Sequence, residues 1–242
     1  MSTTPDASHY AGQDLEALSD LPRYNAWILQ HFSEHLRGRT LEVGAGIGNV
    51  AAHYLPQVDH ALLVEPAVNL FTQLQMRFSG DNRVTTACAL LKDVDPSLLA
   101  QPFDAAIMVN VLEHIEDDAA VLRDLFGRVK PGGALLLFVP ALPFLYGSLD
   151  ELVHHVRRYT MKSLEQVVSD AGFAVHKLRY MDALGMAPWL VVGRVLKQRK
   201  FSQTGAQLYD RVGVPVTKWL EERVKPPLGK SLVCVAIKPE NA

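Results

Sequence analysis

The order of apolar and polar positions divides most of the chain into alternating strand-length and helix-length segments. Seven short apolar runs have the length and composition of buried β-strands. They are residues 40–43, 61–64, 84–88, 105–109, 134–139, 173–178 and 232–237. The segments between the first five runs are long enough for the crossover helices that parallel strands require. This alternation predicts an α/β fold with a doubly wound, mostly parallel sheet and helices on both faces.

Helical spacing of apolar residues marks the segments before the first run and before the fifth. Residues 21–36 show this spacing and predict a helix that leads into the first strand. Residues 117–129 show it too, with Asp117 or Asp118 available as the N-cap. The Lys-Pro-Gly-Gly sequence at 130–133 is expected to stop the second helix.

The last quarter of the chain departs from the alternation. About 50 residues, 181–230, separate the sixth run from the seventh and predict a helical insertion before the final strand. We interpret the insertion as a lid over a substrate site, with a dimer interface and a plain packing layer as the alternatives. A polar segment, 1–20, precedes the first predicted helix. The chain 1–242 is therefore expected to form one domain with a lid.

Composition and charge narrow the classes of protein. The chain has 242 residues, of which 48% are hydrophobic and 21% charged, and its formal net charge is -2. This is the composition of a globular domain large enough to bury a core without disulfides. The near-neutral charge argues against a nucleic-acid partner, although residues 194–230 carry nine Lys or Arg against three acids.

The start of the chain lacks the pattern of a secretory signal, and the longest apolar stretch, 183–192, is shorter than the roughly 20 residues that span a bilayer. We therefore expect a cytoplasmic protein without an integral membrane segment. Cys88 and Cys234 lie in apolar runs and are expected to be buried, reduced thiols. A helix at 189–196 could anchor the insertion to a membrane surface, but burial against the protein is the interpretation we prefer.

The most informative stretch is LEVGAGIGN at 41–49, which contains the first predicted strand and continues past its end. Its glycines, Gly44, Gly46 and Gly48, permit positive φ angles and let a ligand approach the backbone closely. Their G-x-G-x-G spacing is one residue shorter than the dinucleotide fingerprint. Glu42 would repel a pyrophosphate but suits a ligand with an ammonium group, such as the methionine moiety of S-adenosylmethionine.

Glu65 ends the second predicted strand, and Pro66 turns the chain into the next helix. An acid at this strand end accepts hydrogen bonds from ribose hydroxyls. Its distance from the glycines suits NAD as well as S-adenosylmethionine, so Glu65 by itself does not separate the two cofactors.

With these motifs the chain resembles the class I S-adenosylmethionine-dependent methyltransferases, in the branch described as type 11 or type 12 domains. The resemblance covers roughly residues 20–180. The matching motifs are residues 42–48, 65–66, 103–104, 110–115 and 130–133. The resemblance implies a Rossmann-like, seven-stranded sheet whose last strand is antiparallel, and S-adenosyl-L-methionine as the cofactor.

The resemblance also implies a cofactor site. It assigns the three glycines to the methionine portion, Glu65 to the ribose and the region of Asn110 to the flank of the cofactor. The expected cofactor-binding residues are Glu42, Gly44, Ala45, Gly46, Gly48, Asn49, Glu65, Pro66, Asn110 and Val111. The family often places an acid just after the third strand to bind adenine, whereas the first acid here is Asp93. Either backbone groups hold the adenine or Asp93 reaches it.

A subgroup of quinone-pathway O-methyltransferases binds a divalent metal through Glu-x-x-Glu-His. The matching residues here are Asn110, Glu113 and His114, and Asn110 removes a charged oxygen ligand. We therefore predict no metal and expect His114 either to support residues that contact a ligand or to lie at a helix start.

Residues 140–159, after the fifth predicted strand, hold the densest group of reactive side chains. Methyl transfer is an in-line displacement, and a nucleophile that carries a proton gains from a base. Histidine can act as that base near neutral pH, so His155 or His154 is the catalytic candidate, with Tyr146 and Asp150 assisting.

Arg157 and Arg158 could clamp a carboxylate or phosphate of the acceptor, and Asp150 is grouped with them as a substrate-binding candidate. The alternative is that the histidines and arginines only tie this loop to the sheet and cap the next helix.

These observations favour methyl transfer from S-adenosyl-L-methionine to a small-molecule acceptor, on oxygen, with a histidine as general base. Apolar and aromatic residues of the insertion suggest a hydrophobic or glycosylated acceptor. The alternatives are an NAD(P)-dependent oxidoreductase, a non-catalytic binding protein that keeps the cofactor fold, and a nucleic-acid methyltransferase. A homodimer is compatible with the sequence.

Overall fold

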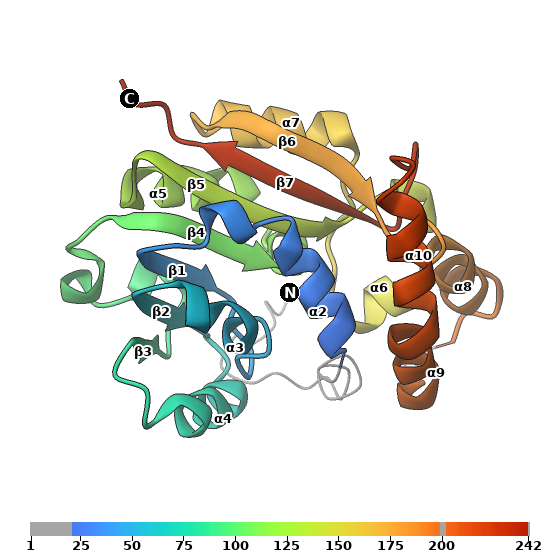
Figure 1. The fold of residues 1–242 in the computed structure, drawn as a ribbon, viewed down its shortest axis with the longest axis horizontal. Helices are drawn as coiled ribbons and strands as arrows, with labels where there is room; N and C mark the ends of the chain where they lie inside the picture. The colour runs from blue at the N-terminus through green and yellow to red at the C-terminus, as the bar shows by residue number, and fades with distance from the viewer. Residues whose placement is uncertain (1–20, 199–201, 242) are drawn as a thin grey trace, which may run out of the picture.

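The computed structural model describes residues 21–198 and 202–241, and within them seven strands form one sheet (Figure 1). The strands are β1 (Arg39–Val43), β2 (His60–Val64), β3 (Val84–Ala87), β4 (Phe103–Val109), β5 (Val129–Pro140), β6 (Ala174–Met181) and β7 (Ser231–Ile237). Their order is β3-β2-β1-β4-β5-β7-β6. β7 is antiparallel to both of its neighbours, and the other pairs are parallel. The predicted mixed sheet with an antiparallel last strand is confirmed.

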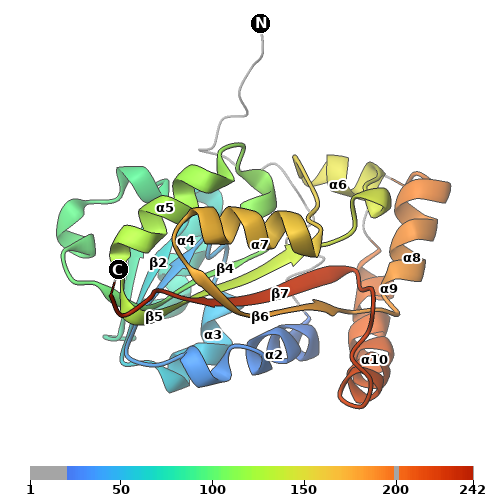
Figure 2. The same ribbon diagram turned by 90° about the horizontal axis from the view of Figure 1, so that it is seen from above.

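Helices cover both faces of the sheet (Figure 2). On one face lie α5 (Asp118–Arg128) and α7 (Met161–Asp170), and on the other lie α2 (Pro22–Gln30), α3 (Ala51–Tyr54) and α4 (Val68–Phe78). Successive side chains of a strand belong to opposite cores, as Leu62 and Leu63 of β2 do. Because both faces are buried, the strands appear in the sequence as continuous apolar runs.

The ends of two predicted helices differ slightly from the expected positions. Asp117 is the N-cap of α5, and its carboxylate accepts a hydrogen bond of 2.9 Å from the amide of Ala120. α5 ends one residue before β5 begins, so residues 130–133 lie in the strand. The helix predicted over 21–36 is shorter, because the chain changes at Ser33 to a short 3-10 turn, η1 (Ser33–His35). The Ser33 hydroxyl donates to the Gln30 carbonyl at 3.1 Å and satisfies an acceptor at the end of α2.

The helical insertion before the last strand is confirmed. It contains α8 (Met186–Trp189), π-helical η7 (Leu190–Val195), α9 (Gln203–Leu208), π-helical η8 (Tyr209–Gly213) and α10 (Val214–Glu221). These helices gather beyond one end of the sheet, next to α2 (Figure 1). The expectation that a helix at 189–196 is buried is wrong, since Val191, Val195 and Leu196 are exposed and Gly193 is the buried residue of η7.

The two cysteines differ in exposure. Cys234 is buried in β7, as expected, but Cys88 is exposed, and its predicted burial is wrong. The reason is its place just past the end of β3, which is an edge strand. Among the described helices, none combines the length and the apolar composition needed to cross a membrane. The polar segment 1–20 lies outside the described residues.

One buried carboxylate ties the insertion to the sheet. Asp182 directly follows β6 and accepts hydrogen bonds from the hydroxyls of Tyr24, at 3.1 Å, and Tyr209. Its Oδ2 lies 2.7 Å from the ammonium of Lys230, the residue before β7. Burial acts to raise the pKa of Asp182, but the charge of Lys230 and these hydrogen bonds outweigh it and hold the pKa below its ordinary value.

Replacing Asp182 with Ala should lower the free energy of unfolding by about 3 to 5 kcal/mol, because the ammonium of Lys230 then lacks its partner. Urea denaturation measures the change. As a matched control, Asp170→Ala removes an exposed carboxylate from α7 and should change stability by less than about 0.5 kcal/mol. Equal stabilities of the two variants would contradict this role of Asp182.

Candidate active site

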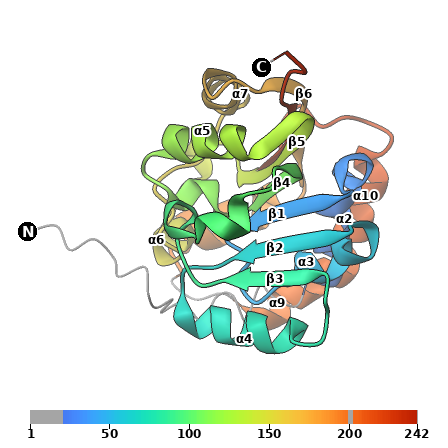
Figure 3. The same cartoon turned by 90° about the vertical axis from the view of Figure 1, so that its left-hand side faces the viewer.

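The order of the strands reverses between β1 and β4, and a cavity of about 1550 Å³ opens at the carboxyl ends of these strands. β1 continues toward β2 on one side and β4 toward β5 on the other, as Figure 3 shows. In open α/β sheets this is the place where ligands bind. The cavity extends from the glycine turn after β1 to the loop after β5 and the insertion helices.

The glycine turn has the backbone that its sequence predicts, with φ of 72° at Gly44, 56° at Gly46 and 80° at Gly48. A Cβ on Gly44 would lie 2.4 Å from a methyl of Val111, so the turn after β1 packs directly on the loop after β4. Gly44 and Gly46 line the cavity. Gly48 lies behind its wall, where an added Cβ would lie 2.4 Å from the ring of Phe78 on α4. The structure thus gives Gly48 a packing role.

Glu42 is a buried acid in the cavity wall. It is 2% exposed, and its Oε2 accepts a hydrogen bond of 2.8 Å from the hydroxyl of Tyr54. Burial raises the pKa of Glu42 to about 8, although the bond from Tyr54 acts in the opposite direction. A cation bound next to this carboxyl would favour its charged form.

Glu65 joins the glycine turn to the end of β2. Its Oε2 accepts from the amide of Gly46 at 2.8 Å, and its Oε1 accepts from the amide of Ala67 at 2.9 Å. Burial raises the pKa of Glu65 despite these two bonds. The carboxylate lines the cavity and keeps further acceptor capacity for hydroxyl donors.

The remaining predicted cofactor residues are also in the cavity wall. They are Ala45, Asn49, Pro66, Asn110 and Val111. Asn110 has φ of 54°, a left-handed conformation that asparagine tolerates, and its amide donates to the carbonyl of Phe138 in β5. Residues 89–92 line the cavity past β3, whereas Asp93 is exposed outside it. Of the two predicted ways to hold an adenine, neither is tested, but Asp93 does not line the cavity.

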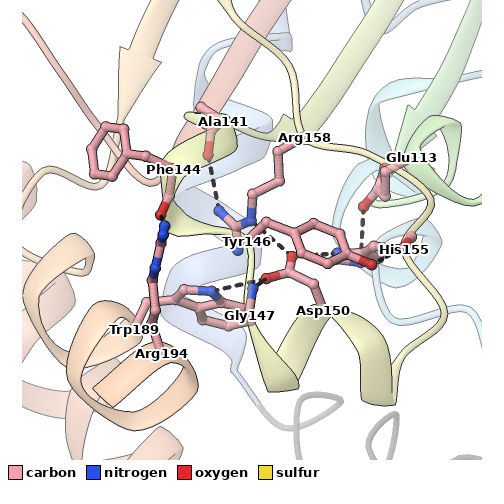
Figure 4. Close-up of polar contacts among 10 residues, drawn as sticks. All are labelled: Glu113, Ala141, Phe144, Tyr146, Gly147, Asp150, His155, Arg158, Trp189 and Arg194. Carbon is pink, nitrogen blue, oxygen red and sulfur yellow. Dashed lines mark hydrogen bonds and ion pairs between the residues drawn. The ribbon is translucent and has the colours of Figure 1, made fainter. Parts of the chain in front are cut away.

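The loop after β5 is organised around the carboxylate of Asp150, in α6 (Ser148–Leu152) (Figure 4). Its Oδ1 accepts from Nδ1 of His155 and from Nε of Arg158, both at 2.8 Å. Its Oδ2 accepts from the amide of Gly147 at 3.0 Å and from the indole of Trp189 at 3.4 Å. Burial acts to raise the pKa of Asp150, but His155 and Arg158 together outweigh it and hold the pKa below its ordinary value.

His155 therefore has a fixed orientation in the cavity wall. Asp150 holds Nδ1, and Nε2 faces away from Asp150, 3.6 Å from Oε1 of Glu113 (Figure 4). His154 also lines the cavity, with φ of 58°. The hydroxyl of Tyr146 donates to the backbone carbonyl of His155 at 2.7 Å, so Tyr146 supports the loop from the cavity wall.

Glu113, His114 and His155 form a compact group beside the cavity. Within the described residues, neither carboxyl oxygen of Glu113 has a hydrogen-bond partner, and burial raises its pKa to about 8. Burial lowers the pKa of His114 to about 4, and His155 adds to the effect. One ligand atom from each of the three residues lies within 4.8 Å of the others, a spacing that could hold a divalent metal. The absence of a metal stays a prediction.

The two arginines have different positions. Arg158 lines the cavity, donates to the carbonyl of Ala141 at 2.9 Å and lies 5.0 Å from the ring centre of Trp189. Arg157 lies outside the cavity wall and pairs with Asp118 of α5 at 2.6 Å. Both therefore help to hold the loop, and Arg158 is the one positioned to meet an acceptor.

Several contacts of the site have no signal in the sequence. Trp189 and Lys230 come from segments far from the motifs, and Tyr54 follows the glycine motif in α3. Each contacts a buried carboxylate of the site or its support. Lys230 also lines the cavity, within 5.9 Å of three aromatic ring centres. In the sequence, only the aromatic residues of the insertion indicated that this segment contributes to the substrate cavity.

Comparison with known proteins agrees with this geometry. The family model described as a methyltransferase domain matches residues 11–178. Fumosorinone synthetase of Cordyceps fumosorosea is 32% identical over 111 residues, which cover 42% of this chain and 3% of that protein. The chain therefore spans a small part of this curated relative.

Two solved structures show the same fold at low identity. An S-adenosylmethionine-dependent methyltransferase of Clostridium acetobutylicum is 9% identical, with a TM-score of 0.60 over 91% of this chain and 92% of that one. A phosphoethanolamine N-methyltransferase of Haemonchus contortus, solved with S-adenosyl-L-methionine, is 21% identical, with a TM-score of 0.57 over 89% of this chain and 52% of that one.

The raised pKa of Glu42 predicts a pH dependence of stability. Folding raises this pKa from 4.5 to about 8, so the contribution of Glu42 is fully present below pH 4.5 and is lost as the pH rises to about 8. The Glu42→Gln variant does not undergo this pH-dependent loss of stability. The stability of the variant relative to the native chain should therefore increase over that range by an amount on the order of 4 kcal/mol.

Urea denaturation at pH 5, 6.5 and 8 measures this difference. Glu165→Gln, which replaces an exposed carboxylate on α7, is the control and should follow the native chain at each pH. A constant difference between Glu42→Gln and the native chain would show that Glu42 is charged throughout.

Proposed function

This chain belongs to the methyltransferase-domain family, and we propose that it transfers the methyl group of S-adenosyl-L-methionine to an oxygen of a small-molecule acceptor, with His155 as the general base. The observation that carries the proposal is His155, which lines the same cavity as the glycine turn and is held from behind by the buried carboxylate of Asp150. The family membership disfavours an NAD(P)-dependent oxidoreductase.

The first part of the cavity fits this cofactor. The buried carboxyl of Glu42 would hold the ammonium of the methionine moiety, and the turn at Gly44 and Gly46 lets the backbone approach it without side chains. Glu65 would accept from the ribose hydroxyls, and the backbone of residues 89–92 would hold the adenine. When bound there, the cofactor supplies an electrophilic methyl group on a positively charged sulfur.

The second part of the cavity supplies the base. With Asp150 holding Nδ1 of His155, Nε2, 3.6 Å from Oε1 of Glu113, would be the ring atom that accepts a proton. Nε2 would take the proton of the acceptor hydroxyl while the walls of the cavity hold that oxygen next to the methyl group that the cofactor would supply. Asp150, itself held by Arg158, stabilises the imidazolium that forms.

The walls of the acceptor region support a hydrophobic acceptor. Side chains from α6, the loop after it and the insertion line this region. The apolar ones include Leu152, Val153, Trp189 and Val214. Arg158 and Lys230 add two cations to this region. Each is already paired with a buried acid, so each would attract an anionic group on the acceptor less strongly than an unpaired cation would. A cytoplasmic location and a homodimer remain predictions from the sequence.

Gly46→Arg should abolish binding of the cofactor, because the new side chain projects into the cavity at the turn. Titration calorimetry with S-adenosylhomocysteine tests this, with NADH as the competing ligand class. Gly80→Arg is the matched control, since a side chain at Gly80 meets nothing within 4 Å. We expect micromolar affinity for S-adenosylhomocysteine in the native chain and in the control. Tighter binding of NADH would exclude the proposed cofactor.

His155→Gln should lower kcat/KM by about 10² to 10⁴ and leave cofactor affinity unchanged. The rate is followed with methyl-labelled S-adenosyl-L-methionine and a panel of phenolic and aliphatic hydroxyl acceptors. The deficit should shrink as the pH approaches the pKa of the acceptor, because an ionised oxygen needs no base.

His154→Gln is the matched control and should keep most of the activity. A deficit of His155→Gln that does not change with pH would assign His155 a structural role instead. An equal loss of activity in His154→Gln would mean that the hydrogen bond between Asp150 and His155 does not single out His155 as the base.

A further inference from the structure

The insertion presents an apolar surface to solvent. Its exposed large apolar side chains are Leu184, Val191, Val195, Leu196, Leu208, Val212, Val216, Trp219, Leu220, Val224 and Leu228. The rest of the described chain contributes Val68, Met76, Leu90, Phe144 and Val156, which are scattered along the sequence. Single exposed apolar residues are ordinary in proteins, whereas a concentration of them marks an interaction surface.

Five of these eleven residues belong to the helix formed by α9, η8 and α10, which lies at the end of the molecule (Figure 1). Its inward side consists of the buried residues Asp210, Val214, Thr217 and Glu221. Its outward side repeats apolar residues at spacings of three and four, namely Leu208, Val212, Val216, Trp219 and Leu220. A helix that is apolar on its outer side requires a partner on that side as well.

The charges around the outward side are mostly positive. The cations along this helix and the turn after it are Arg211, Lys218, Arg223 and Lys225. Two of the three acids nearby, Asp210 and Glu221, are buried on the inward side. The third, Glu222, pairs with Lys218 at 3.9 Å. The guanidinium of Arg223 lies 4.1 Å above the ring of Trp219, so a cation and an aromatic ring lie together near the carboxyl-terminal end of this helix.

We propose that this docking face, the outward side of residues 208–225, binds the surface of an anionic lipid bilayer. The apolar stripe would enter the boundary between headgroups and acyl chains, and the cations beside it would pair with anionic headgroups. A second copy of the chain is a poorer partner, because a two-fold contact would bring the same cations together. The proposal rests on this surface alone and holds whether or not the chain transfers methyl groups to oxygen.

Vesicle flotation tests the proposal with the purified full chain and vesicles of phosphatidylcholine, with or without phosphatidylglycerol. We expect binding to the mixed vesicles, weak binding to phosphatidylcholine alone, and release at high salt. Tryptophan emission should shift to the blue on binding, and the shift should be mostly lost in Trp219→Phe. Trp27 is buried, so it should contribute little to the shift.

The triple variant Arg211→Gln, Arg223→Gln, Lys225→Gln should bind the mixed vesicles roughly a hundredfold more weakly, since each cation contributes about fivefold near an anionic surface. The matched control is Arg37→Gln, Arg123→Gln, Lys162→Gln, which removes three exposed cations from other parts of the surface. It should retain nearly all of the binding. Val212→Ser with Val216→Ser tests the apolar contribution and should also weaken binding, with unchanged circular dichroism.

Two results would overturn the proposal. One is the absence of binding to mixed vesicles by the folded native chain. The other is an equal loss of binding in the triple variant and its control, which would mean that net charge and not this face is responsible. A dimer in light scattering that Val212→Ser with Val216→Ser dissociates, together with no vesicle binding, would identify a second copy of the chain as the occupant.

Discussion

The parallel pairing of β1 with β4 is the constraint on which the rest of the site depends. Thr40, Leu41 and Glu42 lie opposite 105–107, so both strands end at the same level of the sheet. The chain after β1 then meets the chain after β4 at van der Waals distance, and Gly44 has no Cβ to keep Val111 away. This contact forms the floor of the cavity. The crossovers leave in opposite directions on either side of it, which opens the space for a ligand.

Buried carboxyl groups divide the cavity into two electrostatic regions. Near the glycine turn, Glu42 has no cationic side chain as its hydrogen-bond partner, so burial favours its protonated form and a cationic ligand would charge it. Near the loop after β5, Asp150 is fully paired with His155 and Arg158 and stays charged. The first region can therefore respond to binding, whereas the second keeps a base in one orientation. This difference suits a cofactor that carries positive charge and an acceptor that loses a proton.

The parts of the structure that could be predicted from the sequence are those set by neighbouring residues. Strand positions, the Asp117 cap and the glycine turn all depend on a few consecutive side chains. The acceptor region depends on contacts between distant segments, such as that of Trp189 with Asp150, 39 residues apart, so its geometry could not be read from local pattern. The predicted burial of the helix at 189–196 was wrong for a related reason. Apolar spacing identifies a helix, but the surrounding fold decides which side is covered.

Four residues that are not glycine have left-handed backbone at the carboxyl edge of the sheet: Asn110, Leu142, His154 and Asp182. Such a conformation costs roughly 1 to 2 kcal/mol for a residue with a Cβ. Glycine would relieve this cost but would also loosen the loops that shape the cavity. Selection for thermal robustness and selection for a rigid acceptor site therefore act in opposite directions at these positions. Thermostable relatives are expected to gain their stability in the sheet and its covering helices, away from this edge.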